Sequence, residues 1–244
     1  MRLDSFQYFT SDHPPDHLAP ILKRNRFDGS IAVNLDPAGA RGFLELVGRH
    51  EFVRGALVRV DLDDTRLDIF LDECARWPKL RGVVWQAAGA IPWGLDVLQR
   101  RQLTVDVQMT PAQIPLAIEA ARRYPELRMA ILHLASPEVD GAPSEEWSNG
   151  MAVLARYPNV VCKASDLIHL SSGAWNGADL RPYVQHALAA FSPERVMFGS
   201  GWPSGLPDHI WKETLAAFTQ AIGAQSMEVR EELLGGAAAR FYGI

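Results

Sequence analysis

The stretch Arg195-Val196-Met197-Phe198-Gly199-Ser200-Gly201-Trp202-Pro203 decides how the rest of the chain is interpreted. Its apolar or permissive positions 196–199 are typical of a strand buried on both faces, and the Gly-Trp-Pro sequence ends that strand. In parallel α/β proteins the residues just beyond the carboxyl end of a strand meet the ligand. We therefore look for chemistry at Ser200, Gly201 and Trp202, although the strand itself carries no carboxylate, His or Cys.

Strand and helix patterns alternate along the whole chain. The expected strands cover residues 3–9, 30–34, 55–60, 81–86, 103–109, 129–134, 159–164 and 195–199. The expected helices cover residues 15–24, 41–50, 64–77, 92–101, 144–156, 178–190, 208–221 and 227–240, with a further helix that starts in a capping box at Thr110-Pro111-Ala112-Gln113. Eight such units in 244 residues predict a (β/α)8 barrel, a single domain over residues 1–244 with an extra C-terminal helix.

Composition narrows the classes of function. The net charge of -5, from 24 basic and 29 acidic residues, does not indicate binding to nucleic acid or to an anionic membrane surface. The two cysteines, Cys74 and Cys162, show no metal or redox spacing, and no apolar run is long enough to span a bilayer. We expect a cytoplasmic protein that binds a small molecule and needs no cofactor, with its oligomeric state left open, a homo-oligomer included.

In such a barrel the side chains at the strand exits share one mouth. The polar and aromatic residues that this places there are Phe6, Tyr8, Gln86, Asp106, His133, Lys163, Ser200 and Trp202. His133 is a candidate general base or hydrogen-bond donor to a ligand carbonyl, against the alternative of a rim His bonded to a backbone carbonyl. Tyr8 is a candidate donor to an oxyanion, against simple aromatic packing with Phe6.

Two further sets leave alternatives open. Lys163 suits either contact with a substrate anion or a buried ion pair with a neighbouring carboxylate. Asp166 and His169 follow the seventh expected strand and could form an acid and base pair, or simply belong to a solvated loop. A lone His133 with Asp106 or Asp61 is a poor metal site, because zinc needs three or four converging ligands. The sequence therefore predicts no metal.

Several motifs resemble, in order and spacing, those of the amidohydrolase-related barrel hydrolases, specifically the branch of sugar-acid lactonases and pyrone dicarboxylate hydrolases. They are residues 3–9 (Leu-Asp-Ser-Phe-Gln-Tyr-Phe), 55–62, 80–83, 131–134, 159–165, 197–203 and 237–243. The resemblance covers almost the whole chain. It implies the barrel fold and hydrolysis of a small lactone or ester.

The positions at which this chain departs from the family pattern are those of the family's site residues. Where the family carries two His on the first strand, which bind a divalent metal in some members and substrate in metal-independent ones, this chain has Phe6 and Tyr8. The family's strand-eight Asp, which activates water, is here Gly201, and its strand-four Arg is Val84. All four of these residues are replaced, and of the family's site residues only His133 remains. Losing a general base typically costs about 10² to 10⁴ in rate.

Three hypotheses follow. The first is a metal-independent hydrolase of a small lactone or ester, carboxylated or sugar-acid-like, with His133 as base, Tyr8 polarising the carbonyl and Lys163 holding a substrate carboxylate. The second is a repurposed, non-hydrolytic isomerase, lyase or cyclase acting on an apolar ligand. The third is a pseudoenzyme that binds a small molecule or a partner chain. Asp106, Asp166 and His169 are the candidates to replace the missing catalytic Asp.

Overall fold

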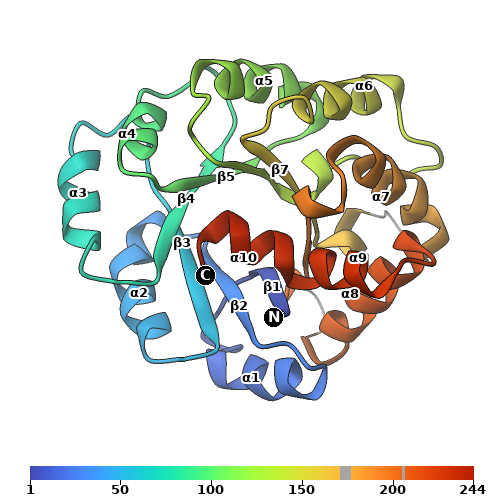
Figure 1. Cartoon of the computed structure of the whole chain (residues 1–244). Coiled ribbons are helices and arrows are strands. Elements are labelled where there is room, and N and C mark those ends of the chain that lie inside the picture. Colours follow the sequence, from blue (N-terminus) through green and yellow to red (C-terminus); the bar gives the residue numbers. More distant parts are fainter. Residues whose placement is uncertain (171–176, 205–206) are drawn as a thin grey trace.

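The computed structural model describes residues 1–170, 177–204 and 207–244, and it shows eight parallel strands in the order β1 to β8. The strands surround a common axis, and the helices lie outside them (Figure 1). The strands are β1 (Leu3–Gln7), β2 (Gly29–Asn34), β3 (Val53–Arg59), β4 (Leu80–Gln86), β5 (Thr104–Gln108), β6 (Met129–Ile131), β7 (Val160–Ser165) and β8 (Val196–Gly199). The predicted (β/α)8 barrel is confirmed.

Eight helices form the outer layer: α1 (Pro15–Arg24), α2 (Ala40–Gly48), α3 (Leu67–Cys74), α4 (Gly94–Arg100), α5 (Ile114–Arg123), α6 (Glu145–Leu154), α7 (Gly177–Phe191) and α8 (Pro207–Ile222). The predicted capping box before α5 is confirmed, since Gln113 Oε1 accepts a hydrogen bond from the Thr110 N–H at 2.8 Å. Ser144 caps α6 in the same way, by accepting from the Trp147 N–H at 3.2 Å.

The barrel closes where the segment after β8 meets β1. The Gly201 N–H donates to the Phe6 carbonyl at 3.0 Å, and the Tyr8 N–H donates to the Trp202 carbonyl at 2.9 Å. The buried Asp4 carboxylate reinforces this seam by accepting from the N–H and the hydroxyl of Ser200, at 2.8 and 2.6 Å. The last strand is therefore held against the first at the carboxyl end of the barrel, where ligands bind in this fold.

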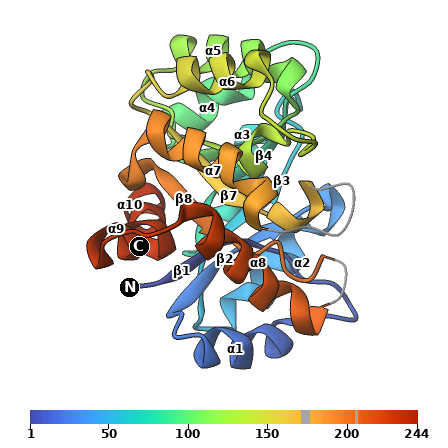
Figure 2. The same ribbon diagram turned by 90° about the vertical axis from the view of Figure 1, so that its right-hand side faces the viewer.

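The opposite end of the barrel is covered by the C-terminal helix. The buried side chains of α10 (Ala237–Tyr242) join one apolar cluster with Leu3, Ile31, Leu57 and Met197 from the strands. In Figure 1 α10 crosses the centre of the barrel, and Figure 2 shows it on the same side as both termini. Because this end is covered, only the carboxyl ends of the strands offer an open mouth.

Local structure departs from the sequence patterns in two places. Simple alternation along β1 places Asp4, Phe6 and Tyr8 on one face, but the pairing with β2 shifts between Asp4 and Gln7, and Asp4 points outward to the Trp211 indole of α8. The helix expected over residues 227–240 is divided into α9 (Met227–Glu231), a π-helical turn and α10. The division occurs around Gly235, where a Cβ atom would lie 2.4 Å from the Met1 carbonyl oxygen.

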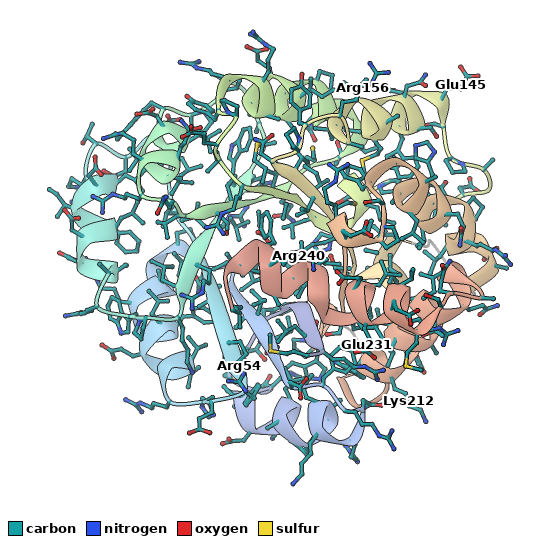
Figure 3. The ribbon with its side chains drawn as sticks, viewed as in Figure 1. Arg54, Glu145, Arg156, Lys212, Glu231 and Arg240 are labelled. Carbon is teal, nitrogen blue, oxygen red and sulfur yellow. The ribbon has the colours of Figure 1, made fainter. Side chains whose placement is uncertain are left out.

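Most charged side chains lie on the outside of the molecule, as Arg54, Glu145 and Arg156 do in Figure 3; Asp4, Asp106 and Lys163 are buried. Several are paired across the surface, for example Arg2 with Glu231 at 2.6 Å. Within the described residues, no helix combines the length and the apolar character needed to cross a membrane.

The β4–β5 contact predicts a stability difference between two glycines. A Cβ at Gly82 would lie 2.2 Å from the Thr104 carbonyl oxygen, whereas a Cβ at Gly42, on the exposed face of α2, meets nothing within 4 Å. We expect Gly82→Ala to lower the free energy of unfolding by at least about 2 kcal/mol. Gly42→Ala should raise it by about 0.5–1 kcal/mol, because Ala favours helix. Urea unfolding checks both values, and equal stability of the two variants would contradict the close strand contact.

Candidate active site

The mouth of the barrel holds a small cavity of about 140 Å³. Its walls come from β1 and β5 and from the segments that follow β1, β2, β6, β7 and β8. They consist of Phe6, Tyr8, Leu35, Gln108, Leu132, His133, Asp166 and Ser204. Three groups that can donate or accept protons, the Tyr8 phenol, the His133 imidazole and the Asp166 carboxylate, therefore share one cavity at the end of the barrel where catalysis occurs in this fold.

The β1 seam positions the two aromatic residues of the cavity. Phe6 lies edge-on to the His133 ring, with ring centroids 4.6 Å apart, so its side chain packs against that imidazole. Tyr8 extends past the end of β1, and its hydroxyl makes a 3.1 Å hydrogen bond with the Ser204 hydroxyl. The Tyr8 phenol is half-buried and is held in place by Ser204. When the Ser204 hydroxyl donates this hydrogen bond, the phenolic proton of Tyr8 is free to bond a ligand.

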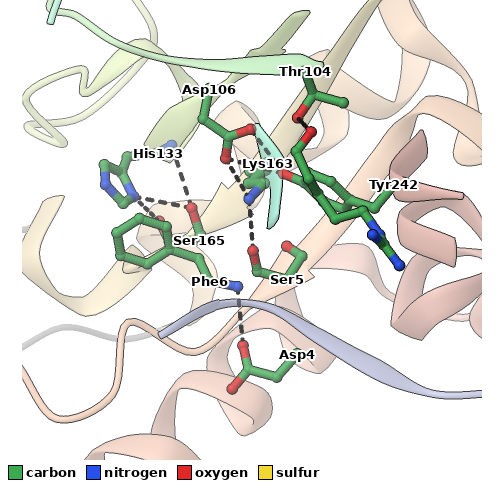
Figure 4. Close-up of polar contacts among 10 residues, drawn as sticks. Asp4, Ser5, Phe6, Thr104, Asp106, His133, Lys163, Ser165 and Tyr242 are labelled. Carbon is green, nitrogen blue, oxygen red and sulfur yellow. Dashed lines mark hydrogen bonds and ion pairs between the residues drawn. The ribbon is translucent and has the colours of Figure 1, made fainter. Parts of the chain in front are cut away.

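His133 is presented by a left-handed turn rather than by a strand. The expected strand 129–134 ends at Ile131, and His133 and Leu134 have φ values of 52° and 55°. The His133 Nδ1 atom contacts the Ser165 hydroxyl at 2.9 Å and the Ser165 carbonyl at 3.3 Å. Burial lowers the pKa of His133, and the nearby Asp166 charge offsets part of that effect. The imidazole is therefore neutral near pH 7, with Nδ1 committed to Ser165 (Figure 4).

Asp166 and His169 form the pair that their spacing suggested. Asp166 has a φ of 53°, and its Oδ1 atom lies 2.7 Å from the His169 Nδ1 atom across a short 3-10 turn, Leu167–Leu170. The Asp166 side chain is 22% exposed and that of His169 is 43% exposed. The hydrogen bond with Asp166 raises the pKa of His169, with burial opposing it. Asp166 lines the cavity, so the pair is more than a solvated loop.

Lys163 and Asp106 lie inside the barrel, below the mouth. The Lys163 ammonium contacts Asp106 at 2.6 Å and donates to the Ser5 carbonyl at 2.6 Å, and both side chains are 0% exposed. The Tyr242 hydroxyl of α10 also donates to Asp106, at 2.8 Å (Figure 4). Of the two alternatives for Lys163, the structure shows the buried ion pair, and no open surface of either side chain is left for a substrate.

Three other residues expected to bind substrate lie around the cavity without lining it. Ser200 is fully buried and donates to Asp4, and Trp202 is 1% exposed and packs edge-on against Phe9. Gln86 is exposed on the rim, where Arg59 donates to its side-chain oxygen. In contrast, Ser204 and Leu35 line the cavity although nothing in the sequence points to them. Only the closure of β8 onto β1 brings Ser204 to the Tyr8 hydroxyl, and no local pattern signals it.

The donor set of this mouth does not fit the divalent metal that some related barrels hold. The places of the two His on the first strand are taken by Phe6 and Tyr8, which offer no imidazole nitrogen. In the part of the chain that the structure describes, no three His, Cys, Asp or Glu side chains converge on a point where an ion could sit. We therefore derive no step through a metal.

The buried ion pair predicts that removing one partner lowers the free energy of unfolding more than removing both. Lys163→Met leaves the Asp106 carboxylate buried without a cation, which should lower the free energy of unfolding by about 3–5 kcal/mol. Lys163→Met combined with Asp106→Leu removes both charges and should recover more than half of that loss. Urea unfolding of the three proteins measures the difference. A double variant as unstable as the single one would contradict the ion pair.

The Asp166–His169 pair predicts a shift in a titration. In Asp166→Asn the pKa of His169 should fall toward its ordinary value of 6.5 because the anionic partner is lost. Since folding raises the His169 pKa, the pair stabilises the fold when His169 is protonated, and this contribution disappears as the pH rises through that pKa. NMR titration of the His169 ring protons in both proteins measures the shift, and identical curves would rule the pairing out.

Comparison with known proteins gives a consistent picture. The family model described as Amidohydrolase matches residues 31–244. An L-fucono-1,5-lactonase of Burkholderia ambifaria is 30% identical to this chain, over 96% of the chain and 86% of its own length.

Two solved structures are similar along almost their whole length. An amidohydrolase from Burkholderia multivorans, crystallised with bound zinc, has a TM-score of 0.86 at 26% identity and covers 100% of this chain and 99% of its own. A putative 2-pyrone-4,6-dicarboxylic acid hydrolase from Pseudomonas putida has a TM-score of 0.84 at 21% identity, with 99% and 97% covered, a likeness that shows the fold alone. On the match over residues 31–244, the chain belongs to the amidohydrolase family.

Proposed function

We propose that this protein is a lactonase-type hydrolase that opens a small lactone, sugar-acid-like or carboxylated, in the cavity at the mouth of the barrel and without a bound metal. The observation that carries the proposal is that Tyr8, His133 and Asp166 line one cavity at the carboxyl ends of the strands. The similarity to an L-fucono-1,5-lactonase over 96% of the chain supports the substrate class.

The size and lining of the cavity support a small polar substrate. Its volume of about 140 Å³ is well below the roughly 300–1,000 Å³ of pockets for drug-sized ligands. The side chains of Gln108, Asp166 and Ser204 add hydrogen-bonding groups to its wall. An isomerase or lyase for an apolar ligand would call for a deep apolar cavity bounded by Trp202, and that side chain is buried in the core instead. The hydrogen-bonding groups in its wall, rather than the apolar ones, favour hydrolysis.

Two groups are suited to polarise a lactone carbonyl. Tyr8 can donate its phenolic proton to the carbonyl oxygen while its own oxygen accepts from Ser204, 3.1 Å away. The neutral His133 can add a second hydrogen bond from its Nε2 atom when Ser165 donates to Nδ1, 2.9 Å away. Both groups then stabilise the negative charge that develops on this oxygen when water attacks. We assign His133 to the carbonyl rather than to the water, because burial disfavours its charged form.

A lactone panel tests the proposal. Sugar-acid lactones and carboxylated lactones are offered to the purified protein, and hydrolysis is followed by acid release. At least one should be opened, with Tyr8→Phe lowering kcat by about 10²–10³ through loss of one oxyanion donor. Tyr157→Phe, a half-exposed tyrosine just before the start of β7, is the matched control and should leave kcat unchanged.

The same preparation tests metal independence. Activity should survive dialysis against a chelator, and elemental analysis should find transition metal far below one equivalent per chain. If no lactone is opened, the pseudoenzyme hypothesis takes the place of this proposal. Turnover that disappears on chelation and returns with zinc would retain the hydrolase and overturn its metal independence.

A further inference from the structure

Gly201 leaves a space at the end of β8 that the Asp166 carboxylate occupies. A Cβ atom built on Gly201 would lie 2.3 Å from Asp166 Oδ1 and 2.9 Å from Asp166 Cγ, distances that real Cβ atoms do not show. Any side chain at position 201 would therefore need the volume that the carboxylate now fills. The space between the ends of β7 and β8 has room for one carboxylate. In this chain that carboxylate belongs to Asp166, at the end of β7.

The backbone around Asp166 directs its carboxylate to this place. Its φ of 53° lies in the left-handed region, which Asp tolerates better than most residues with a side chain. Its N–H donates to the Gly199 carbonyl of β8 at 3.3 Å, and its carbonyl accepts from the His169 N–H at 3.1 Å. The turn that follows β7 is thus joined to both β8 and His169, and the carboxylate cannot swing freely into solvent.

Among residues 1–170, 177–204 and 207–244, the side-chain contacts of the carboxylate involve one oxygen and leave the other for chemistry. Oδ1 is the atom that meets His169 at 2.7 Å and lies over Gly201. Oδ2 is then the oxygen that can accept a proton from a water molecule in the cavity. With the side chain 22% exposed, water reaches Asp166, whereas the lysine-paired Asp106 is 0% exposed. His133 is the weaker candidate for a base, because its Nδ1 atom faces Ser165 rather than a carboxylate that would stabilise an imidazolium.

We propose that Asp166 is the general base of this site, a catalytic carboxylate supplied from the end of β7 in the space that Gly201 leaves at the end of β8, with His169 as its positioning residue. This inference rests on the proposed lactone hydrolysis. It leaves His133 at the lactone carbonyl, in place of the base role that the sequence suggested for it, and it excludes the buried Asp106 from that role.

The step balances without any further reactant. Asp166 removes a proton from water as the water oxygen forms a bond to the lactone carbonyl carbon, and the carbonyl oxygen takes up negative charge against Tyr8. When this intermediate collapses, the bond between the carbonyl carbon and the ring oxygen breaks. The ring oxygen takes the proton back from Asp166 and becomes the hydroxyl of the hydroxy acid product, and Asp166 is again a carboxylate.

Two substitutions at Asp166 separate catalysis from structure. Asp166→Asn keeps the shape of the side chain and should lower kcat on the lactone that the wild type opens by about 10²–10⁴ with KM nearly unchanged. Asp96→Asn on α4, which also removes one acidic charge, should leave kcat unchanged. In Asp166→Gly, added formate should restore part of the lost rate in a saturable way, which a purely structural role does not allow.

Variants that move the carboxylate from position 166 to position 201 test whether the two positions share one space. Gly201→Asp alone should lower the melting temperature and kcat, because its side chain meets Asp166. Asp166→Gly combined with Gly201→Asp returns the carboxylate to β8 and should be more active than Asp166→Gly, and more stable than Gly201→Asp.

The outcomes are distinguishable. Absence of turnover in the wild type overturns the proposed function together with this inference. Wild-type turnover that persists in Asp166→Asn overturns only the base assignment. A loss of rate in Asp166→Asn with no rescue of Asp166→Gly by formate assigns Asp166 a structural role and also overturns it.

Discussion

The hydrogen bonds of the buried Asp4 carboxylate are the interaction on which the mouth of this barrel depends. Asp4 accepts from the N–H and the hydroxyl of Ser200 and from the Trp211 indole, so one side chain on the first strand holds the end of the last strand and an outer helix. Burial raises the pKa of this carboxyl, and the donors that surround it oppose that effect. With the seam closed, Gly201 lies against Phe6, and the space above it is available to Asp166.

Polar groups in this barrel form two sets: those in the interior bond one another, and those at the mouth face the cavity. In the interior, Lys163, Asp106 and Tyr242 satisfy one another and link the strands to α10, which covers the far end. Burying such an ion pair costs desolvation free energy. Removing either partner would leave the other charge buried and unpaired, so the pair favours this arrangement of the strands over others. At the mouth, Tyr8, His133 and Asp166 keep part of their hydrogen-bonding capacity toward the cavity. The proposed chemistry therefore belongs to the mouth, because the interior groups are occupied by one another.

The candidate site retains one residue of its family's chemistry and rearranges the rest. Phe6 fills a position where an imidazole would be expected and packs edge-on against His133, which holds that ring but adds no ligand for a cation. In the proposed site the carboxylate comes from the end of β7, where Asp166 lies over Gly201 at the end of β8. Adjacent strands of a barrel end side by side, so either strand can direct a side chain into the same cavity. A shared fold therefore does not by itself fix which residues carry the proposed chemistry.

Local periodicity and turn chemistry in the sequence were enough to predict the alternation of strands and helices, the capping box before α5, the β8 exit and four candidates that line the cavity, Phe6, Tyr8, His133 and Asp166. The shift in β1 and the break at Gly235 were decided by contacts with distant segments that no local pattern records. Only the tertiary structure decided that Lys163 pairs with Asp106 and that Asp166 fills the space over Gly201. The depth of a side chain along the barrel axis depends on strand register and closure, and a parallel strand specifies neither in isolation.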